Sequence, residues 1–296
     1  MLQRFLMPSV LAGISGLELV ARTVVDGFVA GLHRSPDFGF SQEFAEYIAY
    51  TPGDDLRHID WNVYARNERL VLKRFRGETN SLLTILLDAS NSMQFGSHRV
   101  NKMDYARYFA ASLFYLALHG QRDAAGLITF DDEIRNFIRP STRQGQLHRL
   151  LAGLEQAEAH ARTDFSKPMR YFQEFLKRRG MVLIVSDFWE SPESIVRTIE
   201  PLRYYGNEVV LFHVLDPEDV RPKMNGPSIL VDLETNAELE VTPDYGKKEY
   251  RAKIDAHLAD LRDRTQAAGM GYHLLMTDRP LDEALREYLS LRGARK

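Results

Sequence analysis

The chain has 296 residues, of which 44% are hydrophobic and 27% are charged, and its formal net charge at pH 7 is −3. It is long enough for one large domain or two smaller ones with substantial cores, and no run of like charges indicates a nucleic-acid-binding arm. The sequence contains no cysteine, which excludes disulfides, thiolate catalysis and Cys-ligated metal sites and is consistent with a cytoplasmic location.

The first predicted element is an amphipathic helix within residues 5–32. Its charged residues recur every four positions and share one face, while apolar residues line the other. A membrane-spanning helix needs about 20 mostly uncharged residues, so these charges argue against a transmembrane segment. We expect a helix packed on the rest of the chain, with peripheral association with a membrane surface as the alternative. The charged face holds Glu18, Arg22 and Asp26, and the apolar face holds Leu17, Ala21, Val24, Phe28 and Leu32.

Residues 33–80 form a charged segment with turn signals, and β-rich pieces are predicted around residues 61–64 and 70–75. We expect residues 1–80 to form an N-terminal module ahead of a main domain at residues 81–296. The charged segment is either a surface that binds or regulates a partner, or a small module whose polar groups satisfy one another. The candidate surface residues are Asp54, Asp55, Arg57, Asp60, Trp61 and Arg66.

From Leu82 onward, short apolar runs alternate with helical patterns. The runs lack the period-two alternation of half-exposed strands, so they indicate a parallel sheet covered by helices on both faces. Asp131 and Asp132 predict a hairpin turn into an antiparallel edge strand. The expected fold class is α/β, with a doubly wound, mostly parallel sheet. The predicted strands are 82–88, 124–130, 134–138, 181–187, 208–215 and 272–277, with a hairpin at 228–232 and 238–242; the predicted helices are 102–119, 147–157, 168–178, 195–202, 247–267 and 281–291.

Two of the predicted parallel strands end in aspartate, at Asp88 and Asp187. Ligands of open α/β sheets bind beyond the carboxyl ends of the strands, where the winding direction reverses. Ser90 and Ser92 follow Asp88 at alternate positions, so their side chains share one side while the chain stays extended. Thr163, in a later loop, would supply a further hydroxyl.

These residues make an all-oxygen set of two carboxylates and three hydroxyls, which suits Mg²⁺, with Mn²⁺ or Ca²⁺ as alternatives. Since only two of the ligands are anionic, the cation would accept one more, such as an Asp or Glu of a protein partner. In a further hypothesis Asp54 or Asp55 occupies that open position in cis, although a solvated acidic turn is the simpler interpretation. The alternative for the whole set is that the serines cap a helix and Asp187 begins a turn.

Enzymatic chemistries have less support. The sequence has neither a phosphate-binding P-loop nor a dinucleotide-binding fingerprint, and Ser90 does not lie in a G-x-S-x-G elbow. No general base with an obvious placement accompanies the site, and His213, inside an apolar strand, is predicted to be a core histidine. Two rivals to a binding role stay open: a Mg²⁺-dependent phosphohydrolase using the same strand-end site, and a scaffold whose strand-end residues only cap and turn.

The run from Asp88 to Ser92, DASNS, together with Thr163 and Asp187, resembles the complete metal-ion-dependent adhesion site of von Willebrand factor type A domains. The upstream segment GFSQEFAEYIAYTPGDDLRHIDWNVYAR resembles the signature of bacterial domain-of-unknown-function family 58, which precedes a type A domain in that family. The chain departs from this family at Ile48, where the E-Y-R-x-Y run usually has arginine.

The resemblance implies a role for each site residue. Ser90 and Ser92 would bind the metal directly, Thr163 directly or through water, and Asp88 and Asp187 mainly through water. It also implies a MoxR-type AAA+ ATPase as partner, to which the chain would serve as an adaptor. We therefore predict a non-enzymatic, Mg²⁺-dependent protein-interaction module.

Overall fold

The computed structural model describes residues 6–32, 44–51, 59–67, 69–75, 82–121, 123–159, 167–168, 171–172, 179–223, 226–231, 238–242 and 245–293. The chain separates into two compact units, one made of Met1–Val29 with Asn80–Lys296 and the other of Ala30–Thr79. Most of the predicted amphipathic helix therefore groups with the sheet-containing unit, whereas the sequence placed the whole helix in the same module as the charged segment.

A six-stranded sheet forms the centre of the first unit, with the strand order β10-β7-β6-β3-β4-β5. Neighbouring strands run parallel except for β5, which pairs antiparallel with β4 at one edge. The expected α/β sheet with an antiparallel edge strand is thus confirmed. The strands are β3 (Leu82–Asp88), β4 (Ala124–Phe130), β5 (Ile134–Ser141), β6 (Met181–Ser186), β7 (Glu208–Leu215) and β10 (Gly271–Met276).

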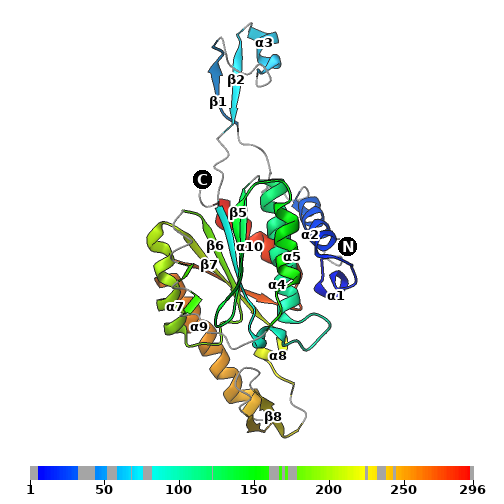
Figure 1. Cartoon of the computed structure of the whole chain (residues 1–296), viewed down its shortest axis with the longest axis vertical. Helices are drawn as coiled ribbons and strands as arrows, with labels where there is room; N and C mark the ends of the chain where they lie inside the picture. The colour runs from blue at the N-terminus through cyan, green and yellow to red at the C-terminus, as the bar shows by residue number, and fades with distance from the viewer. Residues whose placement is uncertain are drawn as a thin grey trace. The chain divides into compact units, whose positions relative to one another are not determined.

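Helices cover the sheet on both faces, with α7 and α9 on one side and α2, α4 and α5 on the other (Figure 1). After β3 the chain adds β4 and β5 in one direction, then crosses back to build β6, β7 and β10 in the other, so the winding reverses between β3 and β6. The helices of this unit are α1 (Pro8–Leu11), α2 (Leu17–Leu32), α4 (Lys102–Tyr115), α5 (Gln146–Glu155), α7 (Pro192–Ile199), α8 (Pro217–Val220), α9 (Arg251–Ala267) and α10 (Leu281–Gly293), with 3-10 turns at Asn91–Gln94 and Glu200–Tyr205 and π-helical turns at Leu116–Gly120 and Tyr245–Tyr250.

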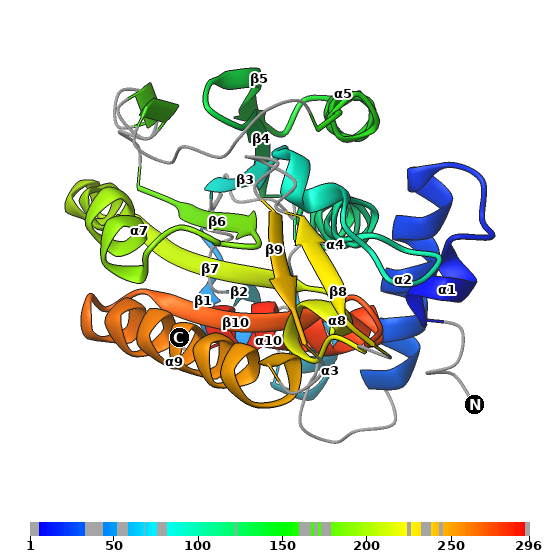
Figure 2. The same ribbon diagram turned by 90° about the horizontal axis from the view of Figure 1, so that it is seen from below.

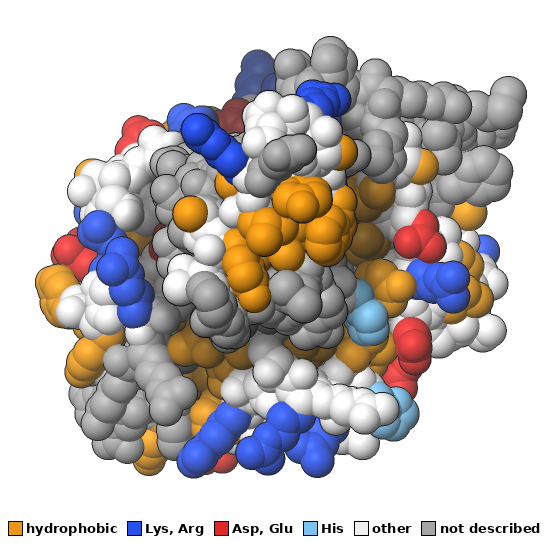
Figure 3. Space-filling model, turned by 90° about the horizontal axis from the view of Figure 1, so that it is seen from above, with side chains coloured by type: hydrophobic (Ala, Val, Ile, Leu, Met, Phe, Trp, Pro, Cys, Tyr) orange, Lys and Arg blue, Asp and Glu red, His pale blue; other side chains and the backbone are white. Residues whose placement is uncertain are grey.

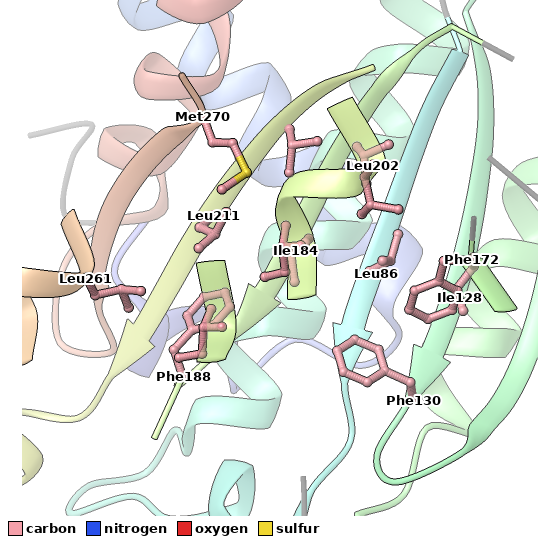
Figure 4. Close-up of a cluster of buried hydrophobic side chains, with 14 residues drawn as sticks. Leu86, Ile128, Phe130, Phe172, Ile184, Phe188, Leu202, Leu211, Leu261 and Met270 are labelled. Carbon is pink, nitrogen blue, oxygen red and sulfur yellow. The ribbon is translucent and has the colours of Figure 1, made fainter. Parts of the chain in front are cut away.

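A cluster of buried hydrophobic side chains joins the sheet to α7 and α9 (Figure 4). Leu86 of β3, Ile184 of β6 and Leu211 of β7 contribute from the strands, and Leu261 contributes from α9. Each of these side chains is fully buried, and removing one from water is worth about 1.5–3 kcal/mol. The close-packed core fixes the strands that carry the polar residues at their carboxyl ends.

Helix α2 confirms the amphipathic helix predicted near the N-terminus. Leu17, Ala21, Val24 and Phe28 are buried, while the charged face is exposed and carries an ion pair between Arg22 and Asp26 at 3.5 Å. No helix in the described part of the chain is long and apolar enough to cross a membrane.

A short antiparallel hairpin, β8 (Ser228–Val231) and β9 (Glu238–Val241), is inserted between α8 and α9. It confirms the hairpin predicted there, although residues 232–237 between its strands lie outside the described residues. Figure 2 looks at the sheet from the end where α8 and this hairpin lie, which is also the end at which β3, β6 and β7 finish.

The second unit contains an antiparallel pair, β1 (Phe44–Ala49) and β2 (Val71–Phe75), and one helix, α3 (Trp61–Asn67). Strand β2 confirms the β-rich piece predicted at residues 70–75, but the prediction for residues 61–64 was wrong. Asp60 starts a helix there because its backbone carbonyl accepts from Tyr64 N at 3.0 Å and its carboxylate lies 3.4 Å from Val63 N. An aspartate at this position satisfies amide groups that the first helical turn leaves open.

Candidate metal-binding site at the carboxyl edge of the sheet

The two strands that end in predicted site residues are neighbours. Strands β3 and β6 pair in parallel, with Leu87 opposite Val185, so Asp88 and Asp187 both lie at the carboxyl edge where the winding reverses. Both are buried, with exposed fractions of 0% and 1%. The two aspartates that the sequence places at strand ends therefore belong to neighbouring strands.

Two uncharged donors, one from each of the neighbouring strand ends, hold the Asp88 carboxylate. Its Oδ1 accepts from Ser90 N at 2.9 Å and its Oδ2 accepts from Ser186 Oγ at 2.6 Å. Burial, together with the nearby charge of Asp187, raises the pKa of Asp88 to about 7, while the hydrogen bonds from Ser186 and Ser90 act in the opposite direction. The folded chain therefore places a carboxylate where its ionised form lacks full compensation.

Ser90 and Ser92 present their hydroxyls to each other, with the two Oγ atoms 3.0 Å apart. Ser90 precedes the 3-10 turn Asn91–Gln94, yet its side chain makes no capping hydrogen bond. Helix α4 is capped instead by Asn101, whose side chain accepts from Asp104 N at 2.7 Å. Helix capping therefore does not explain why two buried hydroxyls stand here.

Asp187 is paired with a lysine that the sequence analysis did not identify. The Nζ atom of Lys102 lies 2.7 Å from Asp187 Oδ2 and 3.2 Å from Asp219 Oδ2. Burial lowers the pKa of Lys102, but the charges of Asp187 and Asp219 outweigh it and hold that pKa above its usual value, so the ammonium stays charged. One signal in the sequence does point to this residue. Lys102 is the first residue of α4, where the helix dipole disfavours a cation.

The backbone after Asp187 is held in an unusual conformation. Phe188 has a φ of +46°, the only positive value among the described non-glycine residues, and such a conformation costs of order 1–3 kcal/mol. Its amide donates to Ser186 Oγ at 3.0 Å, and its carbonyl lies 3.0 Å from His257 Nε2. These contacts, with the buried Phe188 ring, fix the turn that directs Asp187.

Two further strands are followed by aspartates that the sequence analysis did not single out as ligands. Asp131, after β4, bonds Arg135 Nε at 2.6 Å. Asp216, after β7, accepts from Ser97 N at 3.0 Å and from Thr277 Oγ1 at 3.1 Å. Burial alone would raise the pKa of each, but these hydrogen bonds outweigh it and hold both pKa values below the usual range. Both carboxylates are thus stabilised as anions by groups already present, in contrast to Asp88.

The chemistry of the donors fits a hard divalent cation. Carboxylate and hydroxyl oxygens are the ligands that Mg²⁺ and Ca²⁺ prefer, and the raised pKa of Asp88 marks a place where positive charge would be stabilised. Within the described residues, no three His, Cys, Asp or Glu side chains are close enough to hold a metal among themselves. A cation here would therefore depend on the hydroxyls of Ser90 and Ser92 and on ligands from outside the set.

Several predicted site residues lie outside the described residues, namely Thr163, Asp54, Asp55 and Arg57. Among the others, Asp60 is 5% exposed and serves the start of α3, so the prediction that it belongs to a surface was wrong. Trp61 is 60% exposed and packs edge-to-face on Tyr64, with 6.1 Å between the ring centroids, and Arg66 is exposed. Figure 3 shows one face of the molecule, with exposed hydrophobic side chains gathered near its middle.

The chain is similar to several mycobacterial proteins. An uncharacterized protein of Mycobacterium tuberculosis strain H37Rv and one of Mycobacterium bovis are each 29% identical to it over 277 residues, which is 92% of this chain and 86% of each relative. An uncharacterized protein of Mycobacterium avium is 31% identical over 139 residues, 45% of this chain and 78% of the relative.

Distant likenesses to solved structures also exist. The conserved hypothetical protein BatB of Bacteroides thetaiotaomicron aligns with 73% of this chain and 100% of its own, at 15% identity and a TM-score of 0.48. A von Willebrand factor type A protein of Catenulispora acidiphila aligns with 70% of this chain and 41% of its own, at 9% identity and a TM-score of 0.44. Likenesses this remote say nothing about activity or partners.

The match to a protein family is more extensive. Residues 46–264 match the family described as "Protein of unknown function DUF58". This range takes in strands of the second unit and most of the sheet-containing unit, including Asp88, Ser90, Ser92 and Asp187. The chain therefore belongs to the DUF58 family.

Proposed function

We propose that this chain is a protein-interaction module that binds a divalent cation, foremost Mg²⁺, at the carboxyl edge of its sheet. Asp88, Ser90, Ser92 and Asp187 would hold the cation, together with Thr163 from its loop. The bound cation would supply an electrophilic centre for one more oxygen ligand, and an Asp or Glu of a protein partner fits that requirement.

The observation that carries the proposal is the state of Asp88. Its carboxylate is fully buried, it accepts from the uncharged donors Ser90 N and Ser186 Oγ, and its pKa is raised to about 7 by burial and by the charge of Asp187. A buried anion of this kind destabilises the folded protein unless a cation accompanies it. The adjacent Ser90 and Ser92 hydroxyls add neutral oxygen ligands, which leaves the charge of the cation available to a partner.

A MoxR-type AAA+ ATPase is the partner we propose, with the chain acting as an adaptor in the cytoplasm or at the membrane surface. The support is the resemblance of the PGDD-x-R-x-I-D-W run and of the DASNS run to their family patterns. Exposed Trp61 and Arg66 in the second unit provide apolar and cationic groups of the kind found in protein interfaces.

Isothermal titration of the metal-free protein with Mg²⁺ tests the metal site. We expect binding by the natural chain, and loss of that binding in Asp88→Asn. Asp260→Asn provides a matched control, because Asp260 is a half-exposed aspartate of α9 that pairs with Arg264. Equal Mg²⁺ affinity in Asp88→Asn and the natural chain would contradict the assignment.

A pull-down with the purified ATPase, in Mg²⁺ and in EDTA, tests the interaction. Retention of the partner in Mg²⁺ alone, and only by chains with intact Asp88, is the expected result. Full retention in EDTA would contradict a metal-dependent contact. A panel of phosphoester substrates separates the enzyme alternative, since turnover that disappears in Asp88→Asn would show a hydrolase rather than a binding module.

A further inference from the structure

Lys102 is enclosed by the residues around the candidate metal site. Its side chain is 1% exposed, and Nζ contacts both Asp187 and Asp219. The same atom lies 5.6 Å from the centre of the Phe95 ring and 5.7 Å from that of Trp189. Two carboxylates and two aromatic faces therefore surround one ammonium group, which is an environment that stabilises a cation.

The position of Lys102 in the chain shows that this ammonium needs such compensation. As the first residue of α4 it stands where the helix dipole is positive, and it is also removed from water. A lysine whose ammonium reached solvent at this position would keep its hydration and would need less compensation from neighbouring groups. The contacts with Asp187 and Asp219 are therefore what allows a lysine here.

One of the two carboxylates that hold Lys102 is also a candidate metal ligand. Asp187 Oδ2 lies 2.7 Å from the Lys102 ammonium, which makes this the shorter of the two ion pairs of Lys102. A divalent cation that approaches Asp187 must share this carboxylate with a positive charge, and the two cations repel each other across a short, poorly screened distance.

Asp219 gives the ammonium a second acceptor. Its Oδ2 lies 3.2 Å from Nζ and also accepts from Asp216 N at 2.9 Å, which fixes the carboxylate at the start of α8. If Asp187 turns toward a metal, Lys102 keeps one ion pair and is not left as an unpaired buried charge.

We propose that Lys102 is a tethered competitor of the divalent cation, which holds Asp187 in the metal-free protein and weakens metal binding, while Asp219 holds the ammonium when Asp187 serves the metal. This inference rests on the metal site proposed above. It assigns to Lys102 and Asp219 the role of setting the affinity of that site, and neither residue contacts the metal in this scheme.

Titration calorimetry with Mg²⁺ on four chains tests the proposal: the natural chain, Lys102→Met, Asp219→Asn and the double variant. Lys102→Met keeps an unbranched buried side chain and removes the charge, so its Mg²⁺ affinity should rise at least tenfold. Asp219→Asn can still accept from Asp216 N, but it leaves the ammonium wholly on Asp187, so its affinity should fall about tenfold. In the double variant the Asp219→Asn change should have a smaller effect, because the lysine is gone.

Lys223→Met is the matched control, because this lysine side chain is 85% exposed and its removal changes the net charge equally. Its Mg²⁺ affinity should equal that of the natural chain. Circular dichroism in EDTA establishes which variants fold. If Lys102→Met does not fold, the Mg²⁺ affinity of Asp219→Asn alone tests the proposal.

The outcomes separate this proposal from the one on which it rests. Mg²⁺ binding by the natural chain, with the same affinity in Lys102→Met, overturns the role of Lys102 and leaves the metal site intact. Unchanged affinity in a folded Asp219→Asn overturns the role of that residue as alternative acceptor. Binding that is detected only in Lys102→Met supports the competition, whereas no Mg²⁺ binding by any of the chains overturns both proposals.

Discussion

Asp88 is a buried carboxylate whose ionisation the folded chain disfavours. Because burial and Asp187 raise its pKa from 3.8 to about 7, the folded state binds the proton more tightly than the unfolded chain does between these two values. The contribution of Asp88 to stability is therefore unaffected below about pH 4, declines as the pH rises, and reaches its full penalty above pH 7, at most about 4 kcal/mol.

We predict that, in EDTA, replacing Asp88 by Asn removes this dependence. Between pH 5 and pH 8 the natural chain should lose stability relative to Asp88→Asn, by a few kcal/mol. Denaturant unfolding at both pH values gives the change in unfolding free energy for each protein. Subtracting one change from the other isolates Asp88, because the other ionisable groups are the same in both proteins. Parallel stability profiles for the two proteins would show that the Asp88 pKa is not raised in the metal-free state.

His213 makes the stability of the folded chain depend on pH in the opposite direction. It is fully buried in β7, with Nδ1 2.9 Å from the Tyr272 hydroxyl, as the sequence analysis expected of a core histidine. Burial lowers its pKa from 6.5 to about 3, and His257 contributes in the same direction. The unfolded chain therefore binds a proton below pH 6.5 that the folded chain refuses, and stability is lost as the pH falls toward 3.

Replacement of His213 by glutamine should flatten this acid response. At pH 5 the natural chain carries a penalty of about 2 kcal/mol that the His213→Gln variant lacks, since the unfolded histidine is then largely protonated. The measurement is the change in unfolding free energy between pH 7 and pH 5, compared between the two proteins, because lost packing lowers the stability of the variant at both pH values. An equal change in both would contradict a neutral buried imidazole.

Among the elements, the antiparallel edge depends on a close approach between β4 and β5. A Cβ atom on Gly126 would lie 2.7 Å from the ring and the backbone nitrogen of Pro140, nearer than side-chain contacts allow. We predict that Gly126→Ala destabilises the chain by about 1–3 kcal/mol, measured by denaturant unfolding. Gly226→Ala is the control, because nothing lies within 4 Å of its added Cβ, and it should change stability by less than about 0.5 kcal/mol.

The elements also show why sequence patterns predicted most of the sheet. Strands β3, β4 and β7 begin and end at the predicted residues, because their side chains are buried on both faces and their apolar runs are uninterrupted. Helix α3 was missed because Trp61, Val63 and Tyr64 favour strands on their own, and the aspartate before them decides otherwise by holding the first turn.

The candidate site was predictable to the extent that it depends on strand ends. The positions of Asp88 and Asp187 at the carboxyl ends of parallel strands follow from the order of strands and helices along the chain. The contacts of Lys102 with Asp187 and Asp219 do not, because they join residues that are far apart in the sequence and need the register of β3, β6 and β7. Ser186 is a similar case, since its bond to Asp88 follows only from the pairing of β3 with β6.

At the scale of the whole molecule, the family match covers residues of both compact units. In the sheet-containing unit, the strand-end carboxylates of Asp131 and Asp216 are compensated by Arg135 and by hydrogen bonds from Ser97 and Thr277. Burial and the charge of Asp187 instead raise the pKa of Asp88, and in the function proposed above a bound cation would offset that charge. Global stability should therefore depend on divalent metal, because only the folded state assembles β3 beside β6.

We predict that Mg²⁺ at about 100 times its dissociation constant stabilises the chain by about 2.7 kcal/mol, which raises the melting temperature by roughly 4–5 °C. Differential scanning calorimetry in Mg²⁺ and in EDTA measures this shift. The double variant Ser90→Ala/Ser92→Ala should lose most of it, since its carboxylates alone offer too few ligands. Ser112→Ala should retain it, because Ser112 is an equally buried serine that bonds only its own helix, at Tyr108 O. A shift of equal size in the double variant would place the metal elsewhere on the molecule.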